Sequence, residues 1–131
     1  MANQQNQIQQ DQQLKLEQRK EWPDHPGFVD STPPKGSVGA LMSRLAGRLV
    51  ECGSIGVKIC RVASGEADLF AKELSFALWD VAPGSLILEE AGGRLGLWNG
   101  DRVPFDKAQV YYENILAAPA GLFELAVHEL Q

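Results

Sequence analysis

The sequence lacks clustered basic residues and long apolar runs. Its 131 residues include 12 Lys and Arg against 17 Asp and Glu, a formal net charge of −5. Nucleic-acid backbones are bound by clustered Lys and Arg, so this balance argues against DNA or RNA as a partner. No apolar run approaches the ~20 residues that span a bilayer, and the N-terminus lacks the pattern of a signal peptide. We therefore expect a cytoplasmic protein that has no membrane partner.

Cysteine and histidine are also scarce. The chain has two cysteines, Cys52 and Cys60, and two histidines, His25 and His128. The histidines are far from the cysteines in sequence, so nothing indicates a Cys/His metal site. Without a secretory signal, reduced thiols are the simpler expectation.

Large apolar side chains are sparse in residues 1–36. The first 20 residues are rich in glutamine, and residues 21–36 are broken by prolines and glycines, with Pro33-Pro34 favouring an extended linker. Such a segment buries too little apolar surface to offset chain entropy. We expect residues 1–36 to be a disordered Gln/Pro-rich segment and the folded domain to span residues 37–131. The abrupt change of composition near Ser37 is typical of a replaced or truncated N-terminus.

From Ser37 onward the apolar spacing predicts alternating helices and strands. Ser37 is a plausible N-cap for the first helix, and Gly65 and Gly92-Gly93 are expected to end the next two. The expected helices are 38–50, 55–63, 81–91 and 122–130, and the expected strands are 67–71, 94–98 and 115–118. This alternation implies an α/β fold in which helices are layered on a sheet, with the sheet of mixed strand direction.

Two short motifs carry most of the functional information. One is Leu78-Trp79-Asp80-Val81-Ala82-Pro83-Gly84, followed by Glu89-Glu90-Ala91-Gly92-Gly93. The other comprises Gly53-Ser54 and Gly65-Glu66-Ala67-Asp68 upstream. Together they resemble the second half of the inositol monophosphatase superfamily, the magnesium-dependent sugar and nucleotide phosphatases. The resemblance covers about residues 53–129 and implies the C-terminal half of the sugar phosphatase fold.

The resemblance assigns Asp80 to metal binding. In the family the Asp of this Trp-Asp pair ligates a magnesium ion that holds the substrate phosphate, and Mg²⁺ does prefer hard oxygen ligands. From the residues alone, the simpler interpretation of Asp80 is an N-cap for a helix that starts near Val81. Trp79 is expected to be a packing residue rather than a ligand platform.

Three further residues are candidates for substrate binding: Ser54, Lys58 and Glu73. Glycines at a helix opening let the backbone approach an anion, and bisphosphate nucleotidases have a similar Gly-Ser-x-Gly-x-Lys sequence whose lysine can meet a phosphate. The alternative is a solvated Lys58 on the outer face of its helix. Glu73 lies seven positions before Asp80, the offset at which inositol phosphatases place a carboxylate that accepts hydrogen bonds from substrate hydroxyls; the alternative is a solvated surface charge.

One family element is missing. No Asp-x-x-Asp-Gly-[Ser/Thr] segment, which gives the family its other metal ligands, occurs in the sequence. We assign no catalytic residue and expect a partial Mg²⁺-dependent phosphomonoesterase, of inositol phosphate or 3′-phosphoadenosine phosphate type, that is weakly active or inactive alone. The alternative is a non-catalytic module that pairs with a chain supplying the first half, or with copies of itself.

Overall fold

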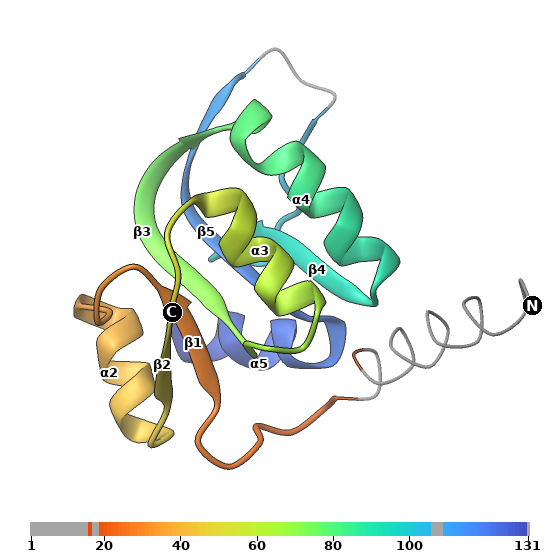
Figure 1. The fold of residues 1–131 in the computed structure, drawn as a ribbon. Helices are drawn as coiled ribbons and strands as arrows, with labels where there is room; N and C mark the ends of the chain where they lie inside the picture. Colours follow the sequence, from red (N-terminus) through yellow and green to blue (C-terminus); the bar gives the residue numbers. More distant parts are fainter. Residues whose placement is uncertain (1–15, 17–18, 106–108, 131) are drawn as a thin grey trace, which may run out of the picture.

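The computed structural model describes residue 16 and residues 19–105 and 109–130 (Figure 1). Helices and strands alternate along most of this length, as the sequence predicts. In chain order the elements are β1 (Gly27–Asp30), α2 (Gly36–Arg44), β2 (Arg48–Glu51), α3 (Ile55–Ala63), β3 (Phe70–Ala77), α4 (Leu78–Glu90), β4 (Gly93–Leu97), β5 (Tyr111–Pro119) and α5 (Ala120–Leu130).

The strands form two hydrogen-bonded groups that meet beside β1. Strands β1 and β2 are parallel, and β5 lies between β3 and β4, antiparallel to both. A parallel bridge between Phe28 and Leu69 joins the groups: the Val29 N–H donates to the Leu69 carbonyl at 3.0 Å, and the Leu69 N–H donates to the Gly27 carbonyl at 3.1 Å. The expected α/β fold, with helices layered on mixed strands, is confirmed.

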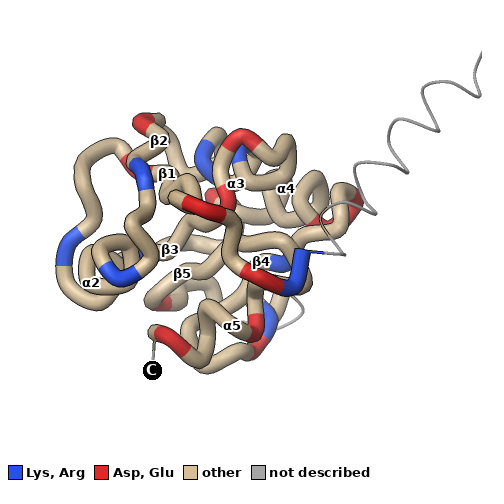
Figure 2. Tube along the Cα trace, turned by 90° about the horizontal axis from the view of Figure 1, so that it is seen from below, with Lys and Arg blue, Asp and Glu red and all other residues tan. Residues whose placement is uncertain are grey.

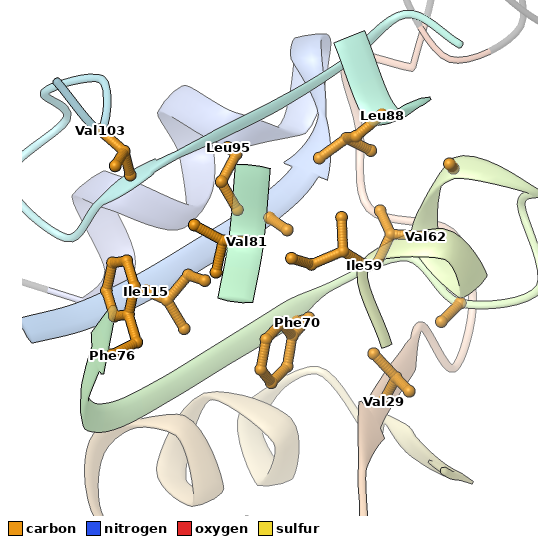
Figure 3. Packing of buried hydrophobic residues seen from close by; sticks show 13 residues of the cluster. Val29, Ile59, Val62, Phe70, Phe76, Val81, Leu88, Leu95, Val103 and Ile115 are labelled. Carbon is orange, nitrogen blue, oxygen red and sulfur yellow. The ribbon is translucent and has the colours of Figure 1, made fainter. Parts of the chain in front are cut away.

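Neighbouring residues of β1, β3 and β5 pack into different cores on opposite faces. Ile115 and Ala117 of β5 join one buried cluster with residues of α3 and α4, whereas Leu116 and Ala118 join a second cluster with residues of α2 and α5. Figure 3 shows the first cluster, in which Val81 of α4 and Ile59 of α3 meet side chains from the strands. The molecule is therefore layered, with α3 and α4 covering one face and α2 and α5 the other (Figure 1).

The expectation that residues 1–36 are disordered is wrong for residues 27–30. These form β1, and all four of its residues are buried. The Asp68 carboxylate, which lies outside the strand, holds its start. The Gly27 N–H donates to Asp68 Oδ2 at 2.7 Å, and Arg19 forms an ion pair with the same carboxylate. The strand has only four residues and lies between prolines, so the sequence pattern does not predict it. Residues 1–15 and 17–18 of the glutamine-rich segment lie outside the described residues.

The helix expected over 38–50 is too long. Helix α2 ends at Arg44, and Arg48–Glu51 forms β2. Ala46 takes a left-handed backbone (φ 50°), and Gly47 lies where a Cβ would be 2.8 Å from the Phe28 ring. This turn breaks the helix, although the apolar spacing continues through it. The residue before α2 is Lys35, and it makes no side-chain capping bond, so Ser37 is not the N-cap.

The other expectations hold with shifted boundaries. The bounds of α3 are those predicted, α4 begins three residues before Val81, and β3 lies later than the strand expected over 67–71.

Cys52 and Cys60 are free thiols. Lys and Arg are spread over several elements (Figure 2). In the part of the chain that the structure describes, no helix is long and apolar enough to cross a bilayer.

Candidate functional site

The candidate site lies along one edge of the strands, the edge that is formed by their carboxyl ends. Because β1 and β2 are parallel and β1 bridges to Leu69 in parallel, the carboxyl ends of β1, β2 and β3 point the same way. Asp30 ends β1, Ser54 follows β2, and Asp80 lies in the first turn of the helix after β3. Open α/β sheets bind ligands at the carboxyl ends of their strands, so this edge is where a site is expected.

A buried cluster of charges occupies part of this edge. Asp30 is 3% exposed and Lys58 is 7% exposed. Asp30 Oδ1 accepts hydrogen bonds from Lys58 Nζ at 3.3 Å, from Lys72 Nζ at 2.9 Å and from the Ser31 N–H at 2.7 Å. Burial by itself would raise the pKa of Asp30, but these bonds outweigh it and hold the pKa below its ordinary value. Asp30 is thus held as a carboxylate that both lysines share.

The structure contradicts the alternative of a solvated Lys58. It is not a solvated lysine on an outer face, because it lies on the buried side of α3 beside the Phe70 ring, 5.4 Å from the ring centroid. Its ammonium is directed to a carboxylate of the same chain. To meet a substrate phosphate, it would have to give up part of its bonding to Asp30.

Glu73 lies on a strand irregularity beside a pocket. The pairing register of β3 with β5 shifts between Lys72 and Ser75, so β3 carries an extra residue there, and Asn114 on β5 takes a left-handed backbone (φ 63°). Such bulges redirect side chains and are frequent next to active sites. Glu73 is exposed. It lines a pocket of about 380 Å³ with Asp30, Thr32, Pro33, Pro34, Lys35, Gly36, Val38, Ala71 and Lys72.

Ser54 opens α3 in a strained conformation. Its φ of 56° lies in the left-handed region that favours glycine, and its side chain makes no capping hydrogen bond. Strain of this kind tends to cluster at functional sites. The residue is exposed, as is Gly53 before it. The first N–H groups of α3 are thus not capped by Ser54, which suits the approach of an anion.

Asp80 does not cap a helix. The N-cap of α4 is Ala77, and Asp80 is an exposed acidic residue in the first helical turn. Helices α3 and α4 run side by side in the same direction, with Gly84 of α4 against Ile59 of α3 (Figure 1). Ser54 and Asp80 therefore lie at the same end of this helix pair. Of the residues that the structure describes, neither of these two lines the pocket beside Glu73.

A complete magnesium site is not formed by the described residues. Mg²⁺ takes a near-octahedral shell of oxygen ligands and uses one or two carboxylates together with water and substrate phosphate. Asp80 can supply one such carboxylate. Within residues 16, 19–105 and 109–130, no group of three or more His, Cys, Asp and Glu side chains could hold a metal ion. The residues present thus supply one ligand of a metal site and no more.

Sequence reasoning missed Asp30. An aspartate that directly follows the apolar run Gly27-Phe28-Val29 is the one signal that could have revealed it, because strand ends often carry functional polar residues. The structure joins Lys58 to Lys72, the neighbour of Glu73, through Asp30. The structure places Ser54 and Asp80 at the N-terminal ends of α3 and α4 instead.

The arrangement of these layers is shared with phosphatases of known structure. Staphylococcal IMPase-II superposes with a TM-score of 0.65 at 18% identity, over 84% of this chain and 43% of that one. CysQ from Bacteroides thetaiotaomicron, a bacterial member of the inositol monophosphatase family, gives 0.64 at 22%, over 76% of this chain and 39% of that one. The fold is thus that of part of these inositol monophosphatase structures.

The sequence gives the particular family. Residues 3–131 match the model of the inositol monophosphatase family, and the chain belongs to that family. Inositol monophosphatase 3 of Solanum lycopersicum is 44% identical over 66 residues, which are 50% of this chain and 23% of the relative. The 3′(2′),5′-bisphosphate nucleotidase 2 of Candida albicans is 26% identical over 109 residues, 79% of this chain and 30% of the relative. The chain thus spans less than a third of either relative.

Proposed function

We propose that this chain is the C-terminal half of a magnesium-dependent phosphomonoesterase and that it is weakly active or inactive alone. The observation that carries the proposal is Asp80, an exposed carboxylate at the end of the α3–α4 pair that also holds Ser54, with no metal cluster around it among the described residues. Metal-assisted phosphate hydrolysis requires ions fixed well enough to activate water and stabilise the leaving oxygen. A single carboxylate is insufficient for both tasks.

In this proposal each residue has a separate role. Asp80 provides one oxygen ligand to Mg²⁺, which when bound would neutralise phosphate charge. The backbone at Ser54 receives the phosphate, and Glu73 accepts hydrogen bonds from substrate hydroxyls at the pocket beside the bulge. Lys58 meets phosphate only if its bond to Asp30 loosens.

The substrate is a small phosphorylated sugar or nucleotide. The relatives support both classes, since SaIMPase-II has been crystallised with inositol monophosphate and with 2′AMP. In this chain Glu73 favours a sugar, and the Gly53–Lys58 segment favours a nucleotide. Both substrates therefore belong in the assay.

The test measures phosphate release and magnesium binding by the pure chain. We expect little or no turnover of inositol monophosphate and 3′-phosphoadenosine 5′-phosphate with added Mg²⁺. Calorimetric titration should show weak magnesium binding that is lost in Asp80→Asn and kept in Glu89→Gln, an exposed acid at the other end of α4. Magnesium-dependent turnover that Asp80→Asn abolishes would overturn the predicted inactivity. An identical near-zero heat in all three proteins would remove the metal role of Asp80.

The second candidate function is a non-catalytic assembly module. The observation that favours it is the apolar outer surface of α4, where Trp79 and Leu86 are 62% and 61% exposed. Size-exclusion chromatography separates the two, because a module of this kind forms a complex whether or not any substrate is turned over.

A further inference from the structure

The charges on the wall of the pocket beside Glu73 balance each other. Of its lining residues, Asp30 and Glu73 are acidic, and Lys35 and Lys72 are basic. The volume of about 380 Å³ is enough for a small ligand. Such a wall suits the part of a ligand that carries no charge and has many hydrogen-bonding groups.

Asp30 has one oxygen that its own chain does not use. Its Oδ1 accepts the bonds from the two lysines and the backbone N–H described above, whereas Oδ2 accepts none from another described residue. In the described chain, the fully buried polar side-chain atoms without a partner are Arg94 Nε and the Tyr112 hydroxyl, so Oδ2 keeps contact with solvent. Since Asp30 is 3% exposed and lines the pocket, Oδ2 is the oxygen that can accept a bond from a molecule there.

Glu73 supplies a second acceptor in the same pocket. It forms no ion pair with another described residue. A Cβ at Gly36 would lie 3.8 Å from Glu73 Oε1, so this side chain extends over the start of α2. Ionised carboxylates only accept hydrogen bonds, so Asp30 and Glu73 both require donors from a ligand, and sugar hydroxyls are donors of this kind.

A second phosphate group would be disfavoured in this pocket. Lys72 already donates to Asp30 at 2.9 Å, and the buried Lys58 donates to the same oxygen at 3.3 Å. An entering anion would have to share these ammonium groups with Asp30, whose own charge would repel it. Lys35 is exposed, so solvent screens its attraction for an anion.

We propose that Asp30 is a specificity-determining residue: together with Glu73 it receives the uncharged, hydroxyl-bearing part of a monophosphorylated sugar, and its charge excludes a second phosphate. The inference rests on the proposed function, in which the substrate phosphate is received at Ser54. It assigns Asp30 a role beyond its pairing with Lys58, because a purely structural ion pair would not distinguish one ligand from another.

The experiment titrates the full chain, without magnesium, with myo-inositol 1-phosphate and with myo-inositol 1,4-bisphosphate, two probes that differ by one phosphate. NMR chemical shifts of the Thr32 and Gly36 amides report binding in the pocket. We expect the monophosphate to bind at least about tenfold more tightly than the bisphosphate. Asp30→Asn should move the ratio of the two Kd values at least about tenfold toward the bisphosphate, because it removes a negative charge at the pocket wall.

Glu51→Gln is the matched control. It removes the same charge from the exposed residue that pairs with Asp30 across β1 and β2, and Glu51 does not line the pocket, so the ratio should stay unchanged. Asp30→Asn/Lys58→Met removes the buried ammonium together with its carboxylate and so keeps the fold if Asp30→Asn alone does not. This double variant should weaken monophosphate binding about fivefold, because a neutral acceptor replaces a charged one.

Four results would overturn the proposal. They are equally tight binding of both probes by the wild-type chain, equal changes of the ratio in Asp30→Asn and Glu51→Gln, unchanged monophosphate binding by the double variant, and no shift of the pocket amides with either probe. The proposed function fails instead if magnesium binding is the same in wild type and Asp80→Asn. That measurement uses neither probe, so the two failures are distinguishable.

Discussion

At the residue scale, Asp30 is a buried carboxylate that pairs with two lysines, Lys58 and Lys72. Its side chain is 4% exposed in the pair with Lys58, whose side chain is 8% exposed, while the Lys72 side chain is 36% exposed. A buried pair adds little to stability as a whole, because desolvation offsets attraction, but removing one member leaves an uncompensated buried charge. Asp30 thus matters mainly because its removal would leave Lys58 buried without a carboxylate partner.

Asp30→Asn should lower the free energy of unfolding by about 3 kcal/mol, since Lys58 would stay buried without its carboxylate. Urea denaturation measures the change. Lys72→Met is the control and should cost less than about 1 kcal/mol, because Lys72 is half-exposed and a near-surface pair is weak. Equal effects of the two variants would contradict the view that burial of Lys58 decides the cost.

The lowered pKa of Asp30 also predicts a pH dependence. A carboxylate whose pKa is lower in the folded state stabilises the fold above its unfolded value, and this contribution is lost as pH falls through the folded value. The ordinary value is 3.8. The stability difference between wild type and Asp30→Asn should therefore be constant near neutral pH and shrink below about pH 4. Urea midpoints measured across this range test it; a difference that grows on acidification would give the wrong sign.

The sequence motifs located the candidate residues on helix openings but not the contacts that surround them. Asp80 and Ser54 could be located because Gly-Ser and Trp-Asp stand at helix openings, and the structure has helices starting there. The Lys58 environment could not be read from the sequence, because Asp30 is 28 residues away and its contact depends on how β1 lies beside α3. Long-range pairs of this kind are invisible to local spacing.

At the element scale, α4 packs directly against α3 at Gly84. A Cβ at Gly84 would lie 3.1 Å from both Cβ and Cγ2 of Ile59. A small residue therefore lets the two helices approach each other and aligns their N-terminal ends, where Asp80 and Ser54 lie.

Gly84→Val should destabilise the protein by about 1–3 kcal/mol, because its methyl groups would overpack this contact. Thermal or urea unfolding measures the loss. Gly56→Ala on α3 is the control: no atom lies within 4 Å of a Cβ there, so the change should stabilise by about 0.5–1 kcal/mol through helix propensity. A stable Gly84→Val protein would show that the helices are free to move apart.

Element boundaries followed from sequence where glycine punctuates the chain. Helix α3 begins after Gly53-Ser54 and ends before Gly65, which has a φ of 83°, so local chemistry fixed both ends. The end of α2 could not be predicted, because Leu49 and Val50 continue the helical spacing and the break depends on the contact of Gly47 with Phe28. Tertiary packing thus overrode a helical pattern.

At the scale of the whole molecule, β1 joins the two cores. Phe28 is buried in the cluster with α2 and α5, and Val29 is buried in the cluster with α3 and α4. Composition alone predicts disorder for this strand, because its four residues offer too short a pattern between prolines. The domain therefore begins before residue 37.

Phe28→Ala should reduce stability by about 3–5 kcal/mol, the cost of emptying a large buried site. The Phe28 side chain is among the largest fully buried ones, at 1% exposed. Chemical denaturation gives the value, and Phe105→Ala, at an exposed phenylalanine, should change it by less than about 0.5 kcal/mol. A Phe28→Ala protein as stable as wild type would show that residues 27–30 are dispensable for the folded domain.

The position of β5 has a consequence for synthesis. This strand is central in its sheet, between β3 and β4, yet it spans residues 111–119. While the ribosome adds residues at about 5–20 per second, β3 and β4 therefore wait for several seconds with unpaired backbone groups. During that interval the nascent chain presents open strand edges, so we expect mispairing and aggregation to threaten this protein most before β5 has been made.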